Sequence, residues 1–260
     1  DLPESWTQEH DVQVLGLTIQ LDGQTYETVG PDKLTSEQLL AKMESGSKPT
    51  TSQINVGQFE DVFRQYAQEG TAVLYVAFAS ALSGTYQSAV MAREMVLEDY
   101  PEAIITILDT KAASMGEGLL VMKAAEARAA GQSLEQTADL LQSLVPRVQT
   151  YFLVDDLNHL MRGGRISKAA ALMGSLVNIK PIIAVTADGS LDSVAKVRGK
   201  KKAQAEVVRM TLETISDPRV VVAYAGEKEV AENVKEQLLT SGQVTEVLIL
   251  PLGPVISTHT

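Results

Sequence analysis

Two short, almost wholly apolar runs with a helical pattern between them constrain the fold of this chain most. Residues 72–78 read AVLYVAF and residues 103–108 read AIITIL. The stretch between them is long enough for a helix of about four turns. Strands that are apolar throughout are typical of parallel sheets, in which helices cover both faces. The pattern therefore predicts an α/β fold.

Further strand patterns alternate with helical patterns along the rest of the chain. They are VQVLGLTI (12–19), TYFLV (150–154), PIIAV (181–185), RVVVAY (219–224) and EVLIL (246–250). Thr35 and Ser133 each precede a glutamine by three residues. This is the spacing of a capping box, so it predicts a helix start at both positions.

The sequence changes character near Val145-Pro-Arg147. Beyond it, residues 155–181 contain one helical pattern stopped by Gly163-Gly164 and a second apolar one that ends before a proline. The dipeptide Asp188-Gly189 is typical of a β-hairpin turn. We therefore predict two domains: a Rossmann-like parallel α/β domain over 1–150 and an α+β domain over 151–260.

The charge of the chain is unevenly distributed. The net charge is −11, and residues 1–150 hold 9 basic and 21 acidic side chains, whereas residues 151–260 hold 13 and 12. An acidic first half repels the phosphates of nucleic acids, so we expect no nucleic acid partner.

Residue types that build metal sites and disulfides are scarce. The chain has no cysteine and only three histidines, without metal-ligand spacing, so we expect no disulfide, thiolate chemistry, metal or other cofactor. No apolar run approaches about 18 residues, and the first residues do not resemble a signal peptide. We therefore expect a cytoplasmic protein without a membrane span. Transient contact with a membrane surface is compatible with this expectation.

Hydroxyl groups and a glycine follow the apolar run 72–78 directly. Ser83, Gly84 and Thr85 stand where a strand leads into a helix. In open parallel sheets ligands collect at such strand ends, where glycine admits a ligand to the backbone and hydroxyls donate to an anion. These residues therefore make a candidate carboxylate site. Capping of the helix by Ser83 is the simpler alternative.

Two further hydroxyl clusters resemble this turn. KPTTSQ (48–53) precedes a helical pattern, and GPVISTHT (253–260) follows the last strand pattern and places His259 between two threonines. A structural role is the commoner one for a lone histidine. At a third strand end, Asp109 and Ser114 are predicted to cap a helix.

The same residues allow an enzymatic alternative. Ser83 as nucleophile, Asp109 and His259 would follow the chain order of some serine hydrolases, but the sequence SALSGT lacks the G-x-S-x-G elbow. No phosphate-binding G-x-x-x-x-G-K-[ST] loop occurs either, so the chain has no visible ATP site.

The motifs TSQ, ALSGTYQSA, LDTKAASMGEG, LMRGGRIS, IKPII, KVRGKKKA and GPVISTHT occur in the order found in the DegV family, which the whole chain resembles. The resemblance implies a two-domain α/β protein that binds one long-chain fatty acid between its domains. It also implies a non-enzymatic subunit of bacterial fatty acid kinase, whose separate ATP-binding subunit phosphorylates the carboxylate for phospholipid synthesis. A lipid-sensing interaction protein and a serine esterase or thioesterase are the alternatives.

Carried over by motif, the carboxylate-binding residues are expected to be Thr51, Ser83 and His259, with Gly84 beside them, while residues 251–260 return to the cleft. Arg198 of KVR and Arg165 of GGRIS are expected on a kinase-facing surface. The expected acyl-tail pocket comprises Ile166, Leu172, Met173 and Leu176. We expect the protein to be a monomer.

The resemblance also predicts differences at the two ends. Family members usually begin with a strand that ends in Thr-Asp-Ser and continue beyond the THT motif. We therefore expect this sequence to be trimmed at both ends.

Overall fold

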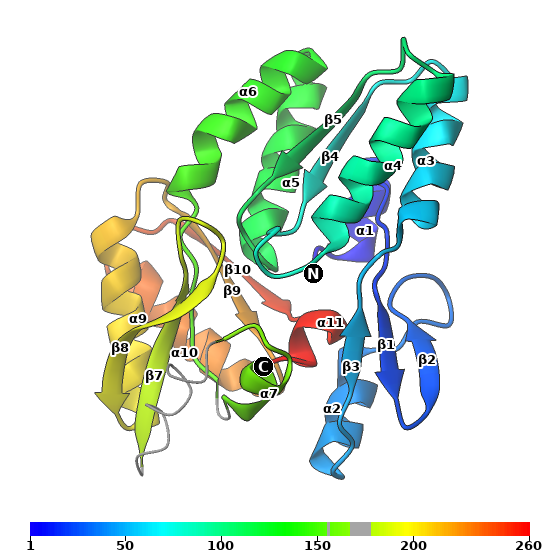
Figure 1. The fold of residues 1–260 in the computed structure, drawn as a ribbon. Helices are drawn as coiled ribbons and strands as arrows, with labels where there is room; N and C mark the ends of the chain where they lie inside the picture. The colour runs from blue at the N-terminus through cyan, green and yellow to red at the C-terminus, as the bar shows by residue number, and fades with distance from the viewer. Residues whose placement is uncertain (155–156, 167–177) are drawn as a thin grey trace.

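The computed structural model describes residues 1–154, 157–166 and 178–260. Its strands are β1 (Thr18–Leu21), β2 (Gln24–Glu27), β3 (Thr50–Ser52), β4 (Val73–Ala77), β5 (Ile105–Asp109), β6 (Tyr151–Phe152), β7 (Ile179–Val185), β8 (Leu191–Arg198), β9 (Arg219–Tyr224) and β10 (Glu246–Pro251). Its helices are α1 (Glu4–Glu9), α2 (Ser36–Glu44), α3 (Val56–Gln68), α4 (Thr85–Asp99), α5 (Met115–Ala129), α6 (Leu134–Leu144), α7 (Asn158–Arg162), α9 (Lys200–Thr214), α10 (Lys228–Thr240) and α11 (Pro254–Ser257), with a 3-10 turn at Val145–Arg147. The predicted α/β class is confirmed (Figure 1).

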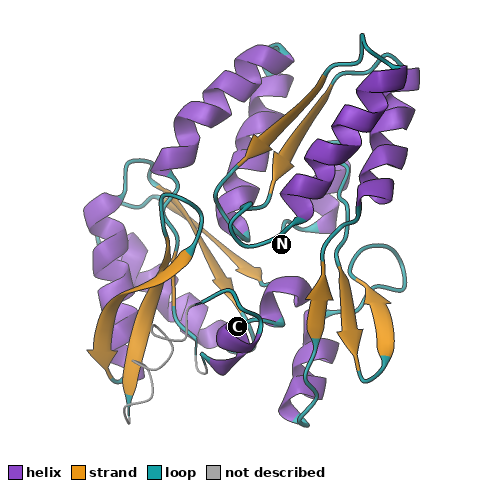
Figure 2. Cartoon of the chain, in the orientation of Figure 1, coloured by secondary structure: helices purple, strands orange, loops and turns teal. Residues whose placement is uncertain are grey.

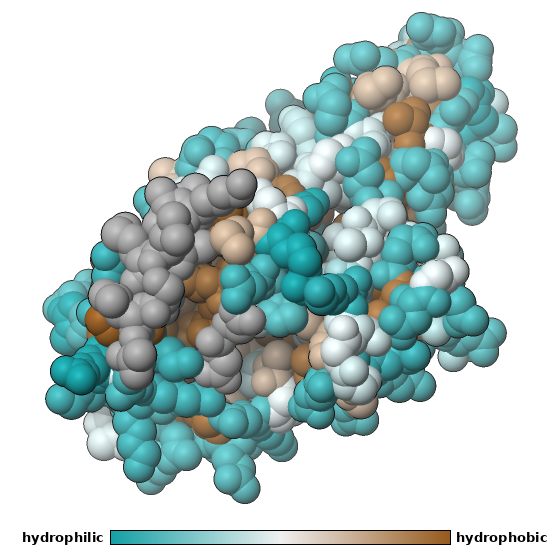
Figure 3. Space-filling view, turned by 60° about the horizontal axis from the view of Figure 1, so that its bottom comes forward, coloured by the Kyte–Doolittle hydropathy of each residue, from teal (hydrophilic) through white to brown (hydrophobic). Residues whose placement is uncertain are grey.

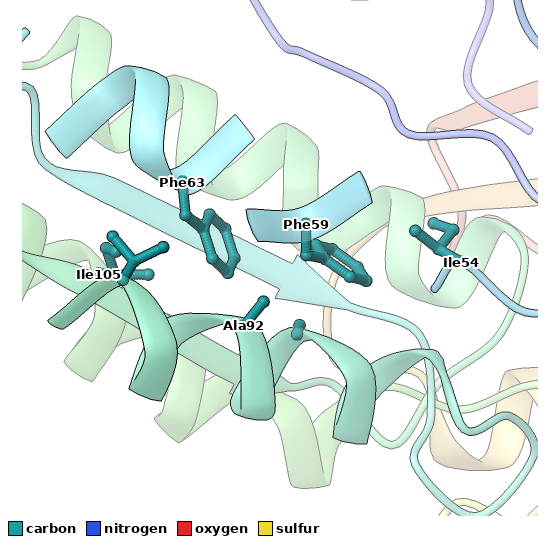
Figure 4. Close-up of a cluster of buried hydrophobic side chains, with 7 residues drawn as sticks. Ile54, Phe59, Phe63, Ala92 and Ile105 are labelled. Carbon is teal, nitrogen blue, oxygen red and sulfur yellow. The ribbon is translucent and has the colours of Figure 1, made fainter. Parts of the chain in front are cut away.

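The parallel layer is built as the two apolar runs predict. β4 and β5 pair in parallel, and their residues alternate between two buried clusters. Val73, Tyr75 and Ile107 pack with α3 and α4, where Phe59 and Phe63 are buried (Figure 4). The other cluster contains, from the strands, Leu74, Val76 and Leu108, and from α5 and α6, Leu120 and Leu141. Helices therefore cover both faces of this sheet (Figure 1).

The first strand pattern forms a different structure from the one its apolar residues suggest. Only its end is a strand, and β1 pairs with β2 and β3 in antiparallel fashion. Val14, by contrast, is 51% exposed. Asp22 and Gly23 both have positive φ and turn the chain back on itself. This Asp-Gly hairpin signal is legible in the sequence, and it decides the antiparallel pairing.

The second half combines antiparallel and parallel pairs. β6, β7 and β8 form an antiparallel sheet, and Asp188 and Gly189 lie in the turn of the β7–β8 hairpin, as predicted. β9 and β10 pair in parallel. α7 ends at Gly163, and Gly164 has a φ of +74°, which confirms the predicted helix stop. The predicted second apolar helix falls largely on residues 167–177, outside the described residues.

Helix starts follow their local signals. Thr35 and Ser133 both form the predicted capping boxes. A third box, between Asn55 and Gln58, starts α3 and was not anticipated.

The end of the chain passes from β10 into α11, which contacts α2. Figure 2 shows α11 near the middle of the molecule, between the groups of strands. The face shown in Figure 3 is mostly hydrophilic, with smaller hydrophobic areas between.

Candidate functional site

Thr51, in the first half of the chain, meets His259, the next-to-last residue. The imidazole Nε2 of His259 lies 2.9 Å from the Thr51 hydroxyl, although 208 residues separate them. Thr51 lies in the middle of β3, and His259 follows α11. Both side chains are partly exposed, so a ligand can reach them. Two of the three predicted carboxylate-binding residues are thus in direct contact.

The electrostatics of His259 favour a neutral ring. Burial and, to a smaller extent, the positive charges of Arg165, Arg162 and His159 together lower the pKa of His259 to about 4. A neutral imidazole has one N–H donor and one acceptor. Its Nε2 can therefore exchange a hydrogen bond with Thr51, while Nδ1 lies against Gly163.

Ser83 lies in a short chain of hydroxyl groups at the start of α4. The Thr85 hydroxyl accepts a hydrogen bond from the Ile54 amide at 3.3 Å and lies 2.9 Å from the Ser83 Oγ. The Ser83 Oγ also accepts from the Thr85 amide at 3.2 Å. The amides of Ile54 and Thr85 both have an acceptor in this arrangement. If the Thr85 hydroxyl donates to Ser83, the Ser83 hydroxyl proton can be donated to an anion. Ser83 thus fixes the turn and keeps one donor to offer.

Gly84 is exposed and lies under the side chain of Gln53. A Cβ at Gly84 would lie 2.1 Å from the Gln53 Oε1. Gln53 is held there because its amide donates to the Ser88 hydroxyl at 3.0 Å. Gly84 was predicted to let a ligand approach the backbone. In the structure, the side chain of Gln53, from the TSQ motif, makes this close approach. This contact also ties the segment after β3 to α4.

Arg165 joins the Ser83 turn to the His259 region. Its Nε donates to the Leu82 carbonyl at 3.1 Å, and its Nη1 donates to the Gly163 carbonyl. Gly163 in turn lies against the His259 ring, because a Cβ at Gly163 would lie 2.4 Å from Nδ1. Arg165 is half-buried between these segments, and its role on a kinase-facing surface stays a prediction.

Arg198, the other predicted kinase-facing residue, is exposed at the end of β8. It is the last of the alternating exposed side chains of that strand. Its position at the surface is compatible with contact to another protein, and the role itself stays a prediction.

The predicted tail pocket is described only in part. Ile166 is 5% exposed and packs in a cluster with Val154, Leu157, Leu160 and Ile183. The remaining predicted lining residues, Leu172, Met173 and Leu176, lie outside the described residues. The described part is therefore a buried apolar cluster in the second half of the chain, which includes Leu160 of α7.

The described contacts do not assemble a hydrolase triad from Ser83, Asp109 and His259. The Asp109 carboxylate accepts hydrogen bonds from the Ser80 hydroxyl at 2.6 Å and the Ser80 amide at 3.2 Å. His259 pairs with Thr51. Asp109 thus links the turns after β4 and β5 and does not orient the histidine.

The predicted capping role of Ser114 is wrong. Ser114 stands at the start of α5 but makes no side-chain cap. Its hydroxyl donates to the carboxylate of Asp1 instead. Its φ of +54° is unusual for a residue with a side chain and turns the hydroxyl away from the helix.

Sequence reasoning did not single out Gln53 or Gly163 as parts of the site. Both lie inside quoted motifs, TSQ and LMRGGRIS, so their positions were visible. Their partners are distant in sequence, and no local pattern specifies such contacts. Among the described residues, no group of three or more acidic, histidine or cysteine side chains could hold a metal ion, and no helix is long and apolar enough to cross a membrane.

Comparison with known proteins identifies the family. The sequence model of the DegV family, described as "Uncharacterised protein, DegV family", matches residues 1–260. A DegV domain-containing protein of Streptococcus pyogenes serotype M1 is 52% identical over 100% of this chain and 91% of its own length. The DegV domain-containing protein YteA of Lactococcus lactis is 46% identical with the same coverage. The chain belongs to the DegV family, which confirms the resemblance seen in the motifs.

Solved structures of the family have the same fold. A fatty-acid-binding DegV family protein from Thermus thermophilus superposes with a TM-score of 0.88 at 33% identity, over 100% of this chain and 92% of the other. A stearic acid-binding protein from Eubacterium ventriosum superposes with a TM-score of 0.90 at 28% identity, over 100% and 91% of the two chains.

Proposed function

We propose that this protein binds one long-chain fatty acid between the two halves of its chain and presents the carboxylate to a separate ATP-binding kinase subunit. Thr51, Ser83 and His259 hold the carboxylate, with Gly84 at its side. The observation that carries this proposal is the 2.9 Å contact between Thr51 and His259, which brings two of the three hydroxyl-rich motifs together.

The chemistry of these groups suits a carboxylate. A buried carboxylate is costly unless its oxygens receive hydrogen bonds, and bonds to an anion are stronger than those between neutral groups. The hydroxyls of Thr51 and Ser83 and the neutral imidazole of His259 can supply such donors. The positive charges of Arg162 and Arg165, which act on His259, also favour an anion nearby.

The acyl tail extends into the second half of the chain, next to the buried apolar cluster that includes Ile166. Burial of about 0.8 kcal/mol per CH₂ gives a C16 chain roughly 10 kcal/mol before the costs of immobilisation. Such a ligand is retained through purification. The names of the fatty-acid-binding relatives from Thermus thermophilus and Eubacterium ventriosum support the same ligand class.

The exposed position of the proposed head-group site supports a kinase partner. Gly84 is exposed, so a carboxylate beside it lies near the surface, where a second protein can reach it. The chain itself has no phosphate-binding loop, so ATP must be bound elsewhere. Arg198 lies on the docking surface, and the monomer works in the cytoplasm without catalysing the transfer itself.

Denaturing extraction of the purified protein followed by mass spectrometry tests the binding proposal. We expect about one equivalent of long-chain fatty acid per chain, because apolar burial outweighs the cost of immobilising the tail. The absence of acyl species, together with no uptake by delipidated protein, would contradict it. Ester turnover that disappears in Ser83→Ala would favour the hydrolase alternative instead.

A further inference from the structure

The entry to α11 is held by three hydrogen bonds from three separate parts of the chain. The Leu252 amide donates to the Tyr224 carbonyl at 2.8 Å, at the end of β9. The Leu252 carbonyl accepts from the Ser36 hydroxyl at 2.5 Å, at the start of α2. The Gly253 amide donates to the Asp1 Oδ1 at 2.7 Å. Two adjacent residues are thus fixed just before the segment that carries His259.

The carboxylate of Asp1 also accepts a second hydrogen bond, from outside this group of three. Its second carboxylate oxygen accepts from the hydroxyl of Ser114, the residue whose positive φ turns its side chain away from α5. Such a φ is unfavourable for a non-glycine residue, and it persists where the surroundings hold the residue in place. The carboxylate of Asp1 therefore joins the start of α5 to the start of α11.

The position of Gly253 is transmitted to His259 through α11. The Ser257 amide donates to the Gly253 carbonyl at 3.0 Å, and the His259 amide donates to the Ile256 carbonyl at 2.9 Å. One short, hydrogen-bonded turn thus separates the anchored residue from the imidazole. The imidazole in turn meets the Thr51 hydroxyl.

We infer that Asp1 is a positioning residue, whose carboxylate fixes Gly253 and, through α11, holds the His259 imidazole against Thr51. The effect on fatty-acid binding rests on the proposed function. The effect on the His259 ring does not, because it depends only on contacts within the chain.

A substitution at Gly253 is an independent way to displace the carboxylate of Asp1. Its φ of −68° is open to any residue, so the glycine is not required by its backbone conformation. A Cβ at this position would lie 2.3 Å from the Asp1 Oδ1. Gly253→Ala therefore displaces the carboxylate, whereas in an Asp1→Ala background the new methyl group has room.

The first readout is the ring of His259 in ligand-free protein. The chain has only three histidines, so their ring signals can be resolved and assigned by NMR. We expect Asp1→Ala and Gly253→Ala each to shift the His259 signals, while the His10 signals report whether α1 is intact. Unchanged His259 signals in both variants would overturn the inference, whatever the protein binds.

The second readout is the Kd for palmitate, measured by displacement of a fluorescent acyl probe. We expect Asp1→Ala to weaken binding about 10-fold in the wild-type background and less than about twofold in His259→Ala, because coupled residues are not additive. Gly253→Ala should likewise weaken binding, but not when Asp1 is already alanine. Asp1→Asn keeps one acceptor oxygen and should fall between Asp1→Ala and wild type.

If Asp1→Ala weakens palmitate binding by the same factor in the wild-type and His259→Ala backgrounds, Asp1 does not act through the imidazole. Wild-type protein that takes up no palmitate would instead contradict the proposed function, and the NMR readout would still decide the role of Asp1.

Discussion

The turn at residues 82–85 and the segment at residues 251–260 both supply candidate head-group ligands, but they are held in place differently. Ser83 is fixed chiefly by Thr85, two residues away, on top of a sheet that is packed on both faces. The His259 ring is fixed by Thr51, a partner 208 residues away in the sequence. The position of Ser83 is therefore set mainly by neighbouring residues, whereas the position of His259 depends on contacts formed by the tertiary structure.

The largest expected difference between the two regions is in how they make the folding stability depend on pH. The pKa of His259 is about 4 in the folded chain and 6.5 in its ordinary state. As the pH falls below 6.5 the unfolded chain takes up a proton first, so the folded state loses stability until about pH 4. We expect His259 to account for a loss of roughly 2 to 3 kcal/mol over this range.

Urea unfolding of wild type and His259→Gln between pH 7 and pH 4.5 measures this loss. The variant should lack that part of the pH dependence, because glutamine does not titrate. Parallel stability curves for the two proteins would contradict a neutral, buried imidazole.

Ser83→Ala tests the local region. We expect it to weaken fatty-acid binding by about 1 to 3 kcal/mol, because one charge-assisted hydrogen bond is lost while the anion stays desolvated. A fatty alcohol of equal length should lose less, since its head group is neutral. Competitive displacement of a fluorescent acyl probe gives both values.

Ser143→Ala, an exposed serine on α6 that bonds only to its own helix, is the matched control. Equal losses for acid and alcohol would show that Ser83 only supports the turn.

Two alanine substitutions compare the regions directly. Gly163→Ala places a methyl group against the His259 ring, and Gly84→Ala places one against the end of the Gln53 side chain. The ring is held at Thr51, whereas the exposed Gln53 side chain can swing outward with the loss of one hydrogen bond to Ser88. We therefore expect Gly163→Ala to weaken fatty-acid binding by about 1 kcal/mol and Gly84→Ala by less. The opposite order, in calorimetric titrations of delipidated protein, would show that the His259 region is the more adaptable one.

The smallest effect on binding is expected for Arg198→Ala. A partner-facing charge affects docking, so the Kd for the fatty acid should stay within about twofold while acyl-phosphate formation with the kinase subunit falls. Lys42→Ala, an exposed cation on α2, should change neither. A parallel loss of binding and phosphorylation in Arg198→Ala would place Arg198 in the ligand site.

Local patterns in the sequence were sufficient for much of the fold. The apolar runs at β4 and β5 predicted parallel strands, and the Thr35 and Ser133 boxes predicted helix starts, because periodicity and capping act over a few neighbouring residues. The Asp22-Gly23 turn was equally local and was overlooked, so the antiparallel pairing of β1 was missed.

The candidate site was predicted as three separate hydroxyl-rich motifs, and the family resemblance rather than physical chemistry placed them together. Their contacts belong to the tertiary structure: Thr51 with His259, Gln53 over Gly84, and Asp1 with Gly253. Each joins segments between about 30 and 250 residues apart, so no periodic or capping signal specifies it. The sequence alone determined which side chains could bind an anion, and the packing of the elements decided which of them meet.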